Sequence, residues 1–198
     1  MGPLIPLLAT DPLIGGLFWA AVAFWLVAEW VFGVRSRPPV GAALRDRGSR
    51  IVVVASVGIG IALAANLAFA VPEAAIAPSR LVPLAGIALM VAGEGFRLYA
   101  IRSLGRYFTF VVALHPGQHL VESGPYRLIR HPSYTGSLVT VLGICLAMAN
   151  WLSLLGVIPA ALGYGYRIRI EERALVEGLG EAYRAYMRRT KRIIPYIV

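Results

Sequence analysis

The 198-residue sequence has little charge, one cysteine and three histidines. Charged residues make up 15% of it and hydrophobic residues 58%, with a mean hydropathy of +0.71, which favours a bundle of membrane helices over a soluble domain. The single Cys145 excludes an internal disulfide and a metal site built from several cysteines. Because His115, His119 and His131 lack the spacing of metal ligands, no metal is predicted.

The N-terminal region lacks the basic segment of a signal peptide, so the first apolar run is expected to stay in the mature protein. The one linker-like stretch, around Pro38 and Pro39, is short, and no internal repeat is evident. We therefore predict a single domain over residues 1–198, with the site within about residues 111–198.

Five apolar runs approach the roughly 20 residues that cross a bilayer. They cover residues 13–33, 51–70, 81–101, 134–149 and 151–166. Pro159 is expected to kink the last run. Apolar residues then recur at every fourth position from Leu175 to Met187, which predicts an amphipathic helix at the membrane surface. The predicted fold class is an all-α integral membrane protein with five transmembrane helices and this C-terminal helix.

The formal net charge is +9, and every lysine and arginine except Arg80 and Arg97 lies in residues 35–50, 102–130 or 167–192. Because these clusters flank apolar runs, retention of positive charge in the cytoplasm explains them better than nucleic acid does. We therefore expect no nucleic acid partner, an outer N-terminus and a cytoplasmic C-terminus. The composition, rich in alanine, glycine and arginine, suggests the cytoplasmic membrane of a bacterium, with the site facing the cytoplasm.

Three ionisable residues, Glu29, Glu94 and Arg97, lie within or at the ends of apolar runs. Such residues are candidates for a functional site, although Arg97 lies near a helix end and can reach the interface. Glu94 and Arg97 are three residues apart, so they can form an ion pair on one helix face.

A polar stretch, residues 124–136, separates the third and fourth apolar runs. A turn would explain its Gly-Pro and His-Pro pairs, but not the grouping of Tyr126, His131 and Tyr134 at the mouth of membrane helices, where polar groups are costly to desolvate. Pro132 keeps His131 out of the helical conformation, and the free N–H groups that follow can bind a carboxylate.

A second polar group follows the fifth run, where Arg167 and Glu171 share a helix face and Glu172 is adjacent. One interpretation is a solvated ion pair between residues four apart. The other is a ligand site, because two adjacent carboxylates at the end of a membrane helix suit a cationic or hydroxyl-rich ligand.

Together these residues resemble the isoprenylcysteine carboxyl methyltransferase family over about residues 80–198. The patterns are Gln118-His119-Leu120-Val121, Gly124-x-Tyr126-x-x-x-Arg130-His131-Pro132-Ser133-Tyr134-x-Gly136, Glu171-Glu172-x-x-Leu175, Gly180-x-x-Tyr183-x-x-Tyr186 and Ile194-Pro195. The resemblance implies S-adenosylmethionine as cofactor, bound by Gln118, His119, Leu120, Val121, Tyr126, Arg130, His131, Pro132, Ser133, Tyr134 and Glu171. It also implies Arg167 as the substrate-binding residue. The residues that we predict to be catalytic are Arg167, Glu171 and Glu172.

The function that the resemblance implies is methyl transfer to the carboxylate of a lipophilic, prenylcysteine-like acceptor, with membrane lipid as the surrounding partner. An arginine and a histidine followed by proline, with a downstream Glu-Glu pair, also occur in phospholipid N-methyltransferases and resemble the end of membrane sterol reductases. An amine N-methyltransferase, which needs a base such as Glu172 or Glu94, is therefore the first alternative. A lipid-binding protein without catalysis is the second. The natural acceptor and the oligomeric state stay open.

Overall fold

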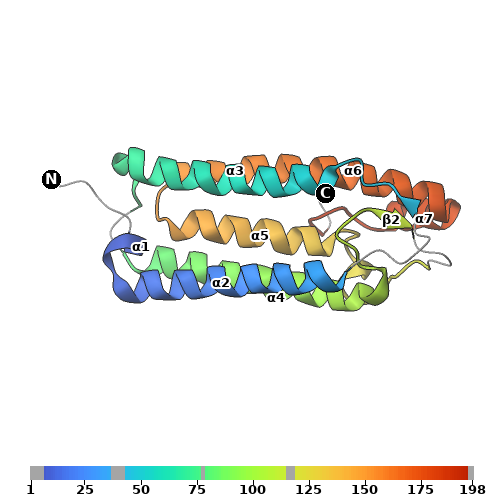
Figure 1. The fold of residues 1–198 in the computed structure, drawn as a ribbon, viewed down its shortest axis with the longest axis horizontal. Helices are drawn as coiled ribbons and strands as arrows, with labels where there is room; N and C mark the ends of the chain where they lie inside the picture. The colour runs from blue at the N-terminus through green and yellow to red at the C-terminus, as the bar shows by residue number, and fades with distance from the viewer. Residues whose placement is uncertain (1–6, 37–42, 77–78, 115–118, 196–198) are drawn as a thin grey trace.

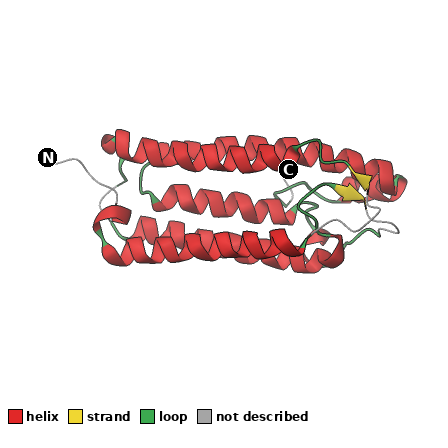
Figure 2. Ribbon diagram, in the orientation of Figure 1, coloured by secondary structure: helices red, strands yellow, loops and turns green. Residues whose placement is uncertain are grey.

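The computed structural model describes residues 7–36, 43–76, 79–114 and 119–195 as a bundle of helices that run side by side (Figure 1). The α-helices are α1 (Leu7–Thr10), α2 (Pro12–Arg35), α3 (Ser49–Ala70), α4 (Leu81–Leu104), α5 (Pro132–Ala147), α6 (Val157–Leu179) and α7 (Glu181–Arg189). The 3-10 helices are η1 (Pro72–Ala74), η2 (Gly105–Tyr107), η3 (Gly124–Arg127) and η4 (Leu152–Gly156). The helical class is confirmed, apart from a two-residue antiparallel ladder between β1 (Ala43–Leu44) and β2 (Ala113–Leu114) (Figure 2).

Three helices, α2, α3 and α4, are long and apolar enough to cross a membrane, and the apolar α5 is shorter. Large side chains such as Trp19, Trp30 and Leu81 project from them and are 65%, 70% and 75% exposed. Exposed apolar surface of this extent is unusual for a soluble monomer and is typical of contact with lipid.

Helix α5 lies in the middle of the bundle, with α3 and α6 on one side and α2 and α4 on the other (Figure 1). It packs backbone to backbone against α4. A Cβ atom added to Gly93 would lie 2.6 Å from the Thr140 nitrogen, and one added to Gly136 would lie 2.6 Å from the Gly93 carbonyl oxygen. This close approach, which small residues permit in membrane helices, fixes the polar N-terminus of α5 against α4.

Two predictions about the C-terminal half are wrong. Because α6 begins at Val157, Pro159 lies in its first turn, where proline is tolerated, and not within the helix, where a kink was expected. The expected amphipathic helix is divided in two. Helix α6 continues to Leu179, Gly180 adopts φ 58°, which favours glycine, and α7 starts at Glu181.

Candidate active site

One cavity collects most of the residues that the sequence singled out. We call it the His131 cavity; it contains about 840 Å³ of space, part of it open solvent. Its lining comes from the loop after α4, the N-terminus of α5 and the adjoining parts of α6 and α7. The predicted site residues in this lining are His119, Leu120, Val121, Tyr126, Arg130, His131, Ser133, Tyr134, Arg167 and Glu171. Pro132 and Glu172 are not in it, and Gln118 lies outside the described residues.

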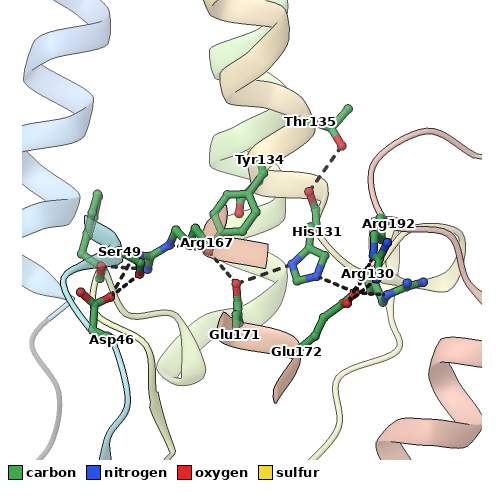
Figure 3. Close-up of polar contacts among 12 residues, drawn as sticks. Asp46, Ser49, Arg130, His131, Tyr134, Thr135, Arg167, Glu171, Glu172 and Arg192 are labelled. Carbon is green, nitrogen blue, oxygen red and sulfur yellow. Dashed lines mark hydrogen bonds and ion pairs between the residues drawn. The ribbon is translucent and has the colours of Figure 1, made fainter. Parts of the chain in front are cut away.

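His131 precedes α5 and lies between two carboxylates (Figure 3). Its Nδ1 is 3.6 Å from Glu171 Oε2, and its Nε2 is 3.4 Å from Glu172 Oε1. Burial by itself lowers the pKa of this imidazole, but the two carboxylates outweigh burial and raise the pKa above 6.5. For Glu171 and Glu172 burial raises the pKa, and hydrogen bonds to His131 and other donors lower it overall. The three groups therefore favour one another's charged forms.

Glu172 binds the rest of the protein rather than the cavity. Arg130 donates from Nε to its Oε1 at 2.6 Å, and Arg192 donates from Nη2 to its Oε2 at 3.0 Å. The side chain is only 7% exposed. A buried carboxylate held by two guanidinium groups and a histidine has no free face for a substrate. This geometry argues against the catalytic role expected of Glu172 and gives it a structural one.

Through its contacts with Arg130 and Arg192, Glu172 links the polar stretch to the chain after α7. Ile129 and Lys191 form a parallel bridge, in which the Lys191 amide donates to the Leu128 carbonyl at 3.1 Å and the Arg130 amide to the Lys191 carbonyl at 2.8 Å. The next amide, that of His131, donates to the Arg192 carbonyl at 3.0 Å. These backbone bonds fix the orientation of residues 129–131, so the position of the His131 ring depends on this C-terminal segment.

Arg167 forms hydrogen bonds to three separate parts of the chain (Figure 3). It donates to Tyr134 Oη at 2.7 Å, to Asp46 Oδ1 and Ser49 Oγ at 3.1 Å each, and to the Phe110 carbonyl at 2.9 Å. A guanidinium has five N–H donors, so these four bonds leave one. Arg167, the expected substrate-binding residue, therefore cannot bind an acceptor carboxylate through two N–H groups while these four bonds are in place. Tyr134 in turn donates to Glu171 Oε2 at 2.6 Å.

A second cavity, the α2–α3 cavity, contains about 1130 Å³ of space, part of it open solvent. Its lining is mainly apolar and comes from α2, α3 and the loop before β2, with further residues from α4, α5 and α6. It shares four lining residues with the His131 cavity, namely Phe108, Thr109, Tyr134 and Arg167. The two cavities therefore meet at the Tyr134–Arg167 pair. No sequence signal marked Phe108 or Thr109, because a single aromatic or hydroxyl residue in a loop looks the same whether or not it lines a cavity.

The expected ion pair between Glu94 and Arg97 is wrong. Arg97 instead donates twice to Glu29 in the α2–α3 cavity, from Nε at 2.6 Å and from Nη2 at 3.1 Å. Glu94 is buried, and both its oxygens lack a hydrogen-bond partner among the described residues. Proximity along one helix suggested the wrong partner, because the true one belongs to α2.

Comparison with known proteins shows what this arrangement is similar to. Residues 86–177, which hold the polar stretch, α5 and nearly all of α6, match the model of the Isoprenylcysteine carboxyl methyltransferase (ICMT) family. Over this segment, which is just under half of its length, the chain is similar to that family.

The curated relatives of this chain include members of the ICMT family. It is 33% identical over 119 residues to a probable protein-S-isoprenylcysteine O-methyltransferase of Oryza sativa subsp. indica, covering 59% of this chain and 62% of the relative. It is 30% identical over 115 residues to protein-S-isoprenylcysteine O-methyltransferase B of Arabidopsis thaliana, covering 57% and 58%. The match thus spans about three-fifths of the length of these relatives. The uncharacterized protein YpbQ of Bacillus subtilis (strain 168) is 33% identical over 92 residues, covering 46% of this chain and 54% of YpbQ.

The ICMT fold extends beyond the matched segment. A solved structure of a eukaryotic intramembrane Ras methyltransferase ICMT superposes with a TM-score of 0.66 at 21% identity, covering 93% of this chain and 67% of that one. Helices α2 and α3, which match the family in sequence only by being hydrophobic, are therefore part of the shared fold.

Proposed function

We propose that this protein transfers a methyl group from S-adenosylmethionine to the carboxylate of a lipophilic, prenylcysteine-like acceptor. The observation that carries the proposal is the meeting of two unlike cavities at Tyr134 and Arg167. One has a charged wall of His131 and Glu171, whereas the other is mainly apolar and is lined by helices that can cross a membrane. A polar methyl donor and a lipophilic methyl acceptor need two adjoining sites of this kind.

The donor set of the His131 cavity suits S-adenosylmethionine. Glu171 is 27% exposed and can accept from an ammonium or from hydroxyl groups, and the imidazolium of His131 can face a carboxylate. Tyr183 lines the cavity, and its buried hydroxyl lacks a hydrogen-bond partner among the described residues, as expected of a group that meets a ligand. When bound, this cofactor supplies an electrophilic methyl group.

The residues of the α2–α3 cavity favour a carboxylate acceptor over an amine. Arg50, Arg97 and Arg167 line it, against one carboxylate, Glu29, which Arg97 already holds through two hydrogen bonds. Such a group of guanidinium ions attracts a carboxylate and repels an ammonium. A carboxylate is ionised at neutral pH and needs no base, so the chain has only to position it in line and exclude water.

The amine N-methyltransferase alternative has weaker support. Of the two bases that the sequence offered, Glu172 is held by Arg130 and Arg192, and Glu94 lines neither cavity. A general base must lie within hydrogen-bond reach of the proton it takes.

The proposal is tested with purified protein and methyl-labelled S-adenosylmethionine. We expect base-labile label on N-acetyl-S-farnesylcysteine and none on phosphatidylethanolamine. N-acetyl-S-methylcysteine, which has the same carboxylate without the lipid, should react at least about tenfold less efficiently, because it gains none of the burial that a prenyl chain gains in the α2–α3 cavity. Label on phosphatidylethanolamine alone would establish the amine alternative, and label on neither, with S-adenosylmethionine bound, would refute the carboxylate acceptor.

We further propose that the chain is one domain with five membrane spans, formed by α2, α3, α4, α5 and the pair of η4 with the first part of α6. The arginine-rich end of the bundle, which holds the His131 cavity, then faces the cytoplasm of a bacterial cell. A reporter fused after Val198 should be active in the cytoplasm, and one fused before Met1 should be active only outside it. If both ends report the same side, the number of spans is even and this topology is wrong.

A further inference from the structure

The surface of α6 carries a feature that methyl transfer does not use. Ile158, Leu162 and Tyr166 are exposed to 53%, 70% and 42%. Arg169 and Arg173 follow, also exposed, and neither forms an ion pair with another described residue. At 100° per residue these five positions share one helix face. The face is thus apolar along one half and basic along the other.

The apolar half of this face is about as long as one lipid leaflet is thick. Ile158 and Arg169 are eleven residues apart, a rise of about 16 Å, which is close to half of the roughly 30 Å hydrocarbon core. An acyl chain can therefore lie along Ile158, Leu162 and Tyr166 while its headgroup reaches the arginines.

The arginines also line an open groove between α6 and the segment at and after α7. Its walls are Arg169, Glu172, Arg173, Val176, Glu177, Met187 and Arg192. Glu172 is already bound by Arg130 and Arg192, and Glu177 lies 4.0 Å from Arg45. The positive charges of Arg169 and Arg173 are thus left for a ligand, and a phosphate is the anion that two arginines suit best.

We propose that this α6 face is a binding site for an anionic phospholipid of the leaflet on the side of the His131 cavity. The phosphate binds Arg169 and Arg173 in the groove, and an acyl chain packs on the apolar half of the face. The proposal rests on the placement of the helices in a membrane and not on methyl transfer, so failure of the methyltransferase assay would leave it standing.

The test is native mass spectrometry of the full chain, delipidated in a nonionic detergent and titrated with dioleoylphosphatidylglycerol or dioleoylphosphatidylcholine. We expect phosphatidylglycerol to bind at least about tenfold more tightly. Arg169→Gln with Arg173→Gln should remove this preference, weakening phosphatidylglycerol binding at least about tenfold and leaving phosphatidylcholine binding unchanged. Equal affinity of the two lipids for the wild-type protein would overturn the proposal.

The matched control is Arg184→Gln with Arg188→Gln. It removes the same charge from exposed positions of α7 that do not line the groove, and it should keep phosphatidylglycerol affinity within about twofold of the wild type. Equal weakening in both double variants would mean that net charge alone attracts the lipid. Unchanged binding in Arg169→Gln with Arg173→Gln would mean that these arginines form no site. Either result overturns the proposal. Soluble glycerol phosphate that displaces the lipid at equal concentration would overturn it too, because the apolar half would then contribute nothing.

Discussion

Replacing Glu171 by glutamine should weaken S-adenosylmethionine binding by roughly 10- to 100-fold, whereas the same change at the adjacent Glu172 should hardly alter binding. Glu171 lines the His131 cavity and is partly exposed, so a ligand can reach it. Loss of a hydrogen bond to a charged group is worth about 1.5–3 kcal/mol. Glu172 does not line that cavity, and its carboxylate is already bound by protein donors. Isothermal titration of both variants measures the difference.

For stability the order is reversed: Glu172→Gln should lose more than Glu171→Gln. Glu172→Gln leaves Arg130, 8% exposed, without its charged partner, and an uncompensated buried charge costs about 3–5 kcal/mol. The loss of the bond to Arg192 adds little, because that side chain is 46% exposed. Thermal unfolding in detergent should therefore show a large drop for Glu172→Gln and a small one for Glu171→Gln. Equal loss of cofactor affinity in both variants would contradict the assignment of the two carboxylates.

The pH dependence of stability offers a check on Glu172. Burial raises its pKa, but His131, Arg192 and Arg130 lower it overall, below the ordinary 4.5. A lowered pKa means that this carboxylate stabilises the fold above about pH 4.5 and that the contribution is lost as the pH falls through the folded-state pKa. On acidification, the free energy of unfolding should therefore decrease more for the wild type than for Glu172→Gln.

The sequence predicted the elements well because local composition determines them. A run of about twenty apolar residues must form a helix in a membrane, where backbone groups have no other partners. Helices α2, α3 and α4 accordingly cover residues 12–35, 49–70 and 81–104, within a few residues of the predicted runs. The errors arose where one residue decides a boundary. Pro159 lies in a first turn rather than within a helix, and Gly180 ends α6 inside the stretch where one amphipathic helix was expected.

The candidate site was predicted in its residues but not in its pairings. The polar stretch and Glu171 do meet in one cavity, as the sequence patterns implied. The partners of the buried arginines come from far along the chain, since Arg97 binds Glu29 across 68 residues and Arg167 binds Asp46 across 121. Charge alone cannot choose among distant carboxylates. The sequence also did not show that Glu171 lines the cavity while Glu172 binds protein donors. Adjacent residues of a helix point in different directions, and the sequence alone does not say which one faces the cavity.

Changes at Arg167 should separate a carboxylate acceptor from an amine acceptor. With a carboxylate, kcat/KM should fall in the order wild type, Arg167→Lys, Arg167→Met, and the methionine variant should lose on the order of 10²–10³, equivalent to about 3–4 kcal/mol. Lysine keeps the charge but loses the planar fork that binds several acceptors at once. With an amine acceptor, loss of this cation should be tolerated, because it removes a repulsion. Steady-state rates on one working acceptor decide between the two.

Arg167 also holds Asp46, Ser49 and the Phe110 carbonyl, so its loss disturbs structure as well as any contact with the acceptor. Asp46→Asn is the matched control, because it breaks the ion pair at 3.1 Å and keeps the guanidinium. If Arg167 only braces the fold, the methionine and asparagine variants should lose stability and turnover in parallel. If it contacts the acceptor, Arg167→Met should lose far more turnover than Asp46→Asn at a comparable unfolding temperature, while titration shows similar cofactor affinity in both. Wild-type rates in Arg167→Met would refute the carboxylate assignment.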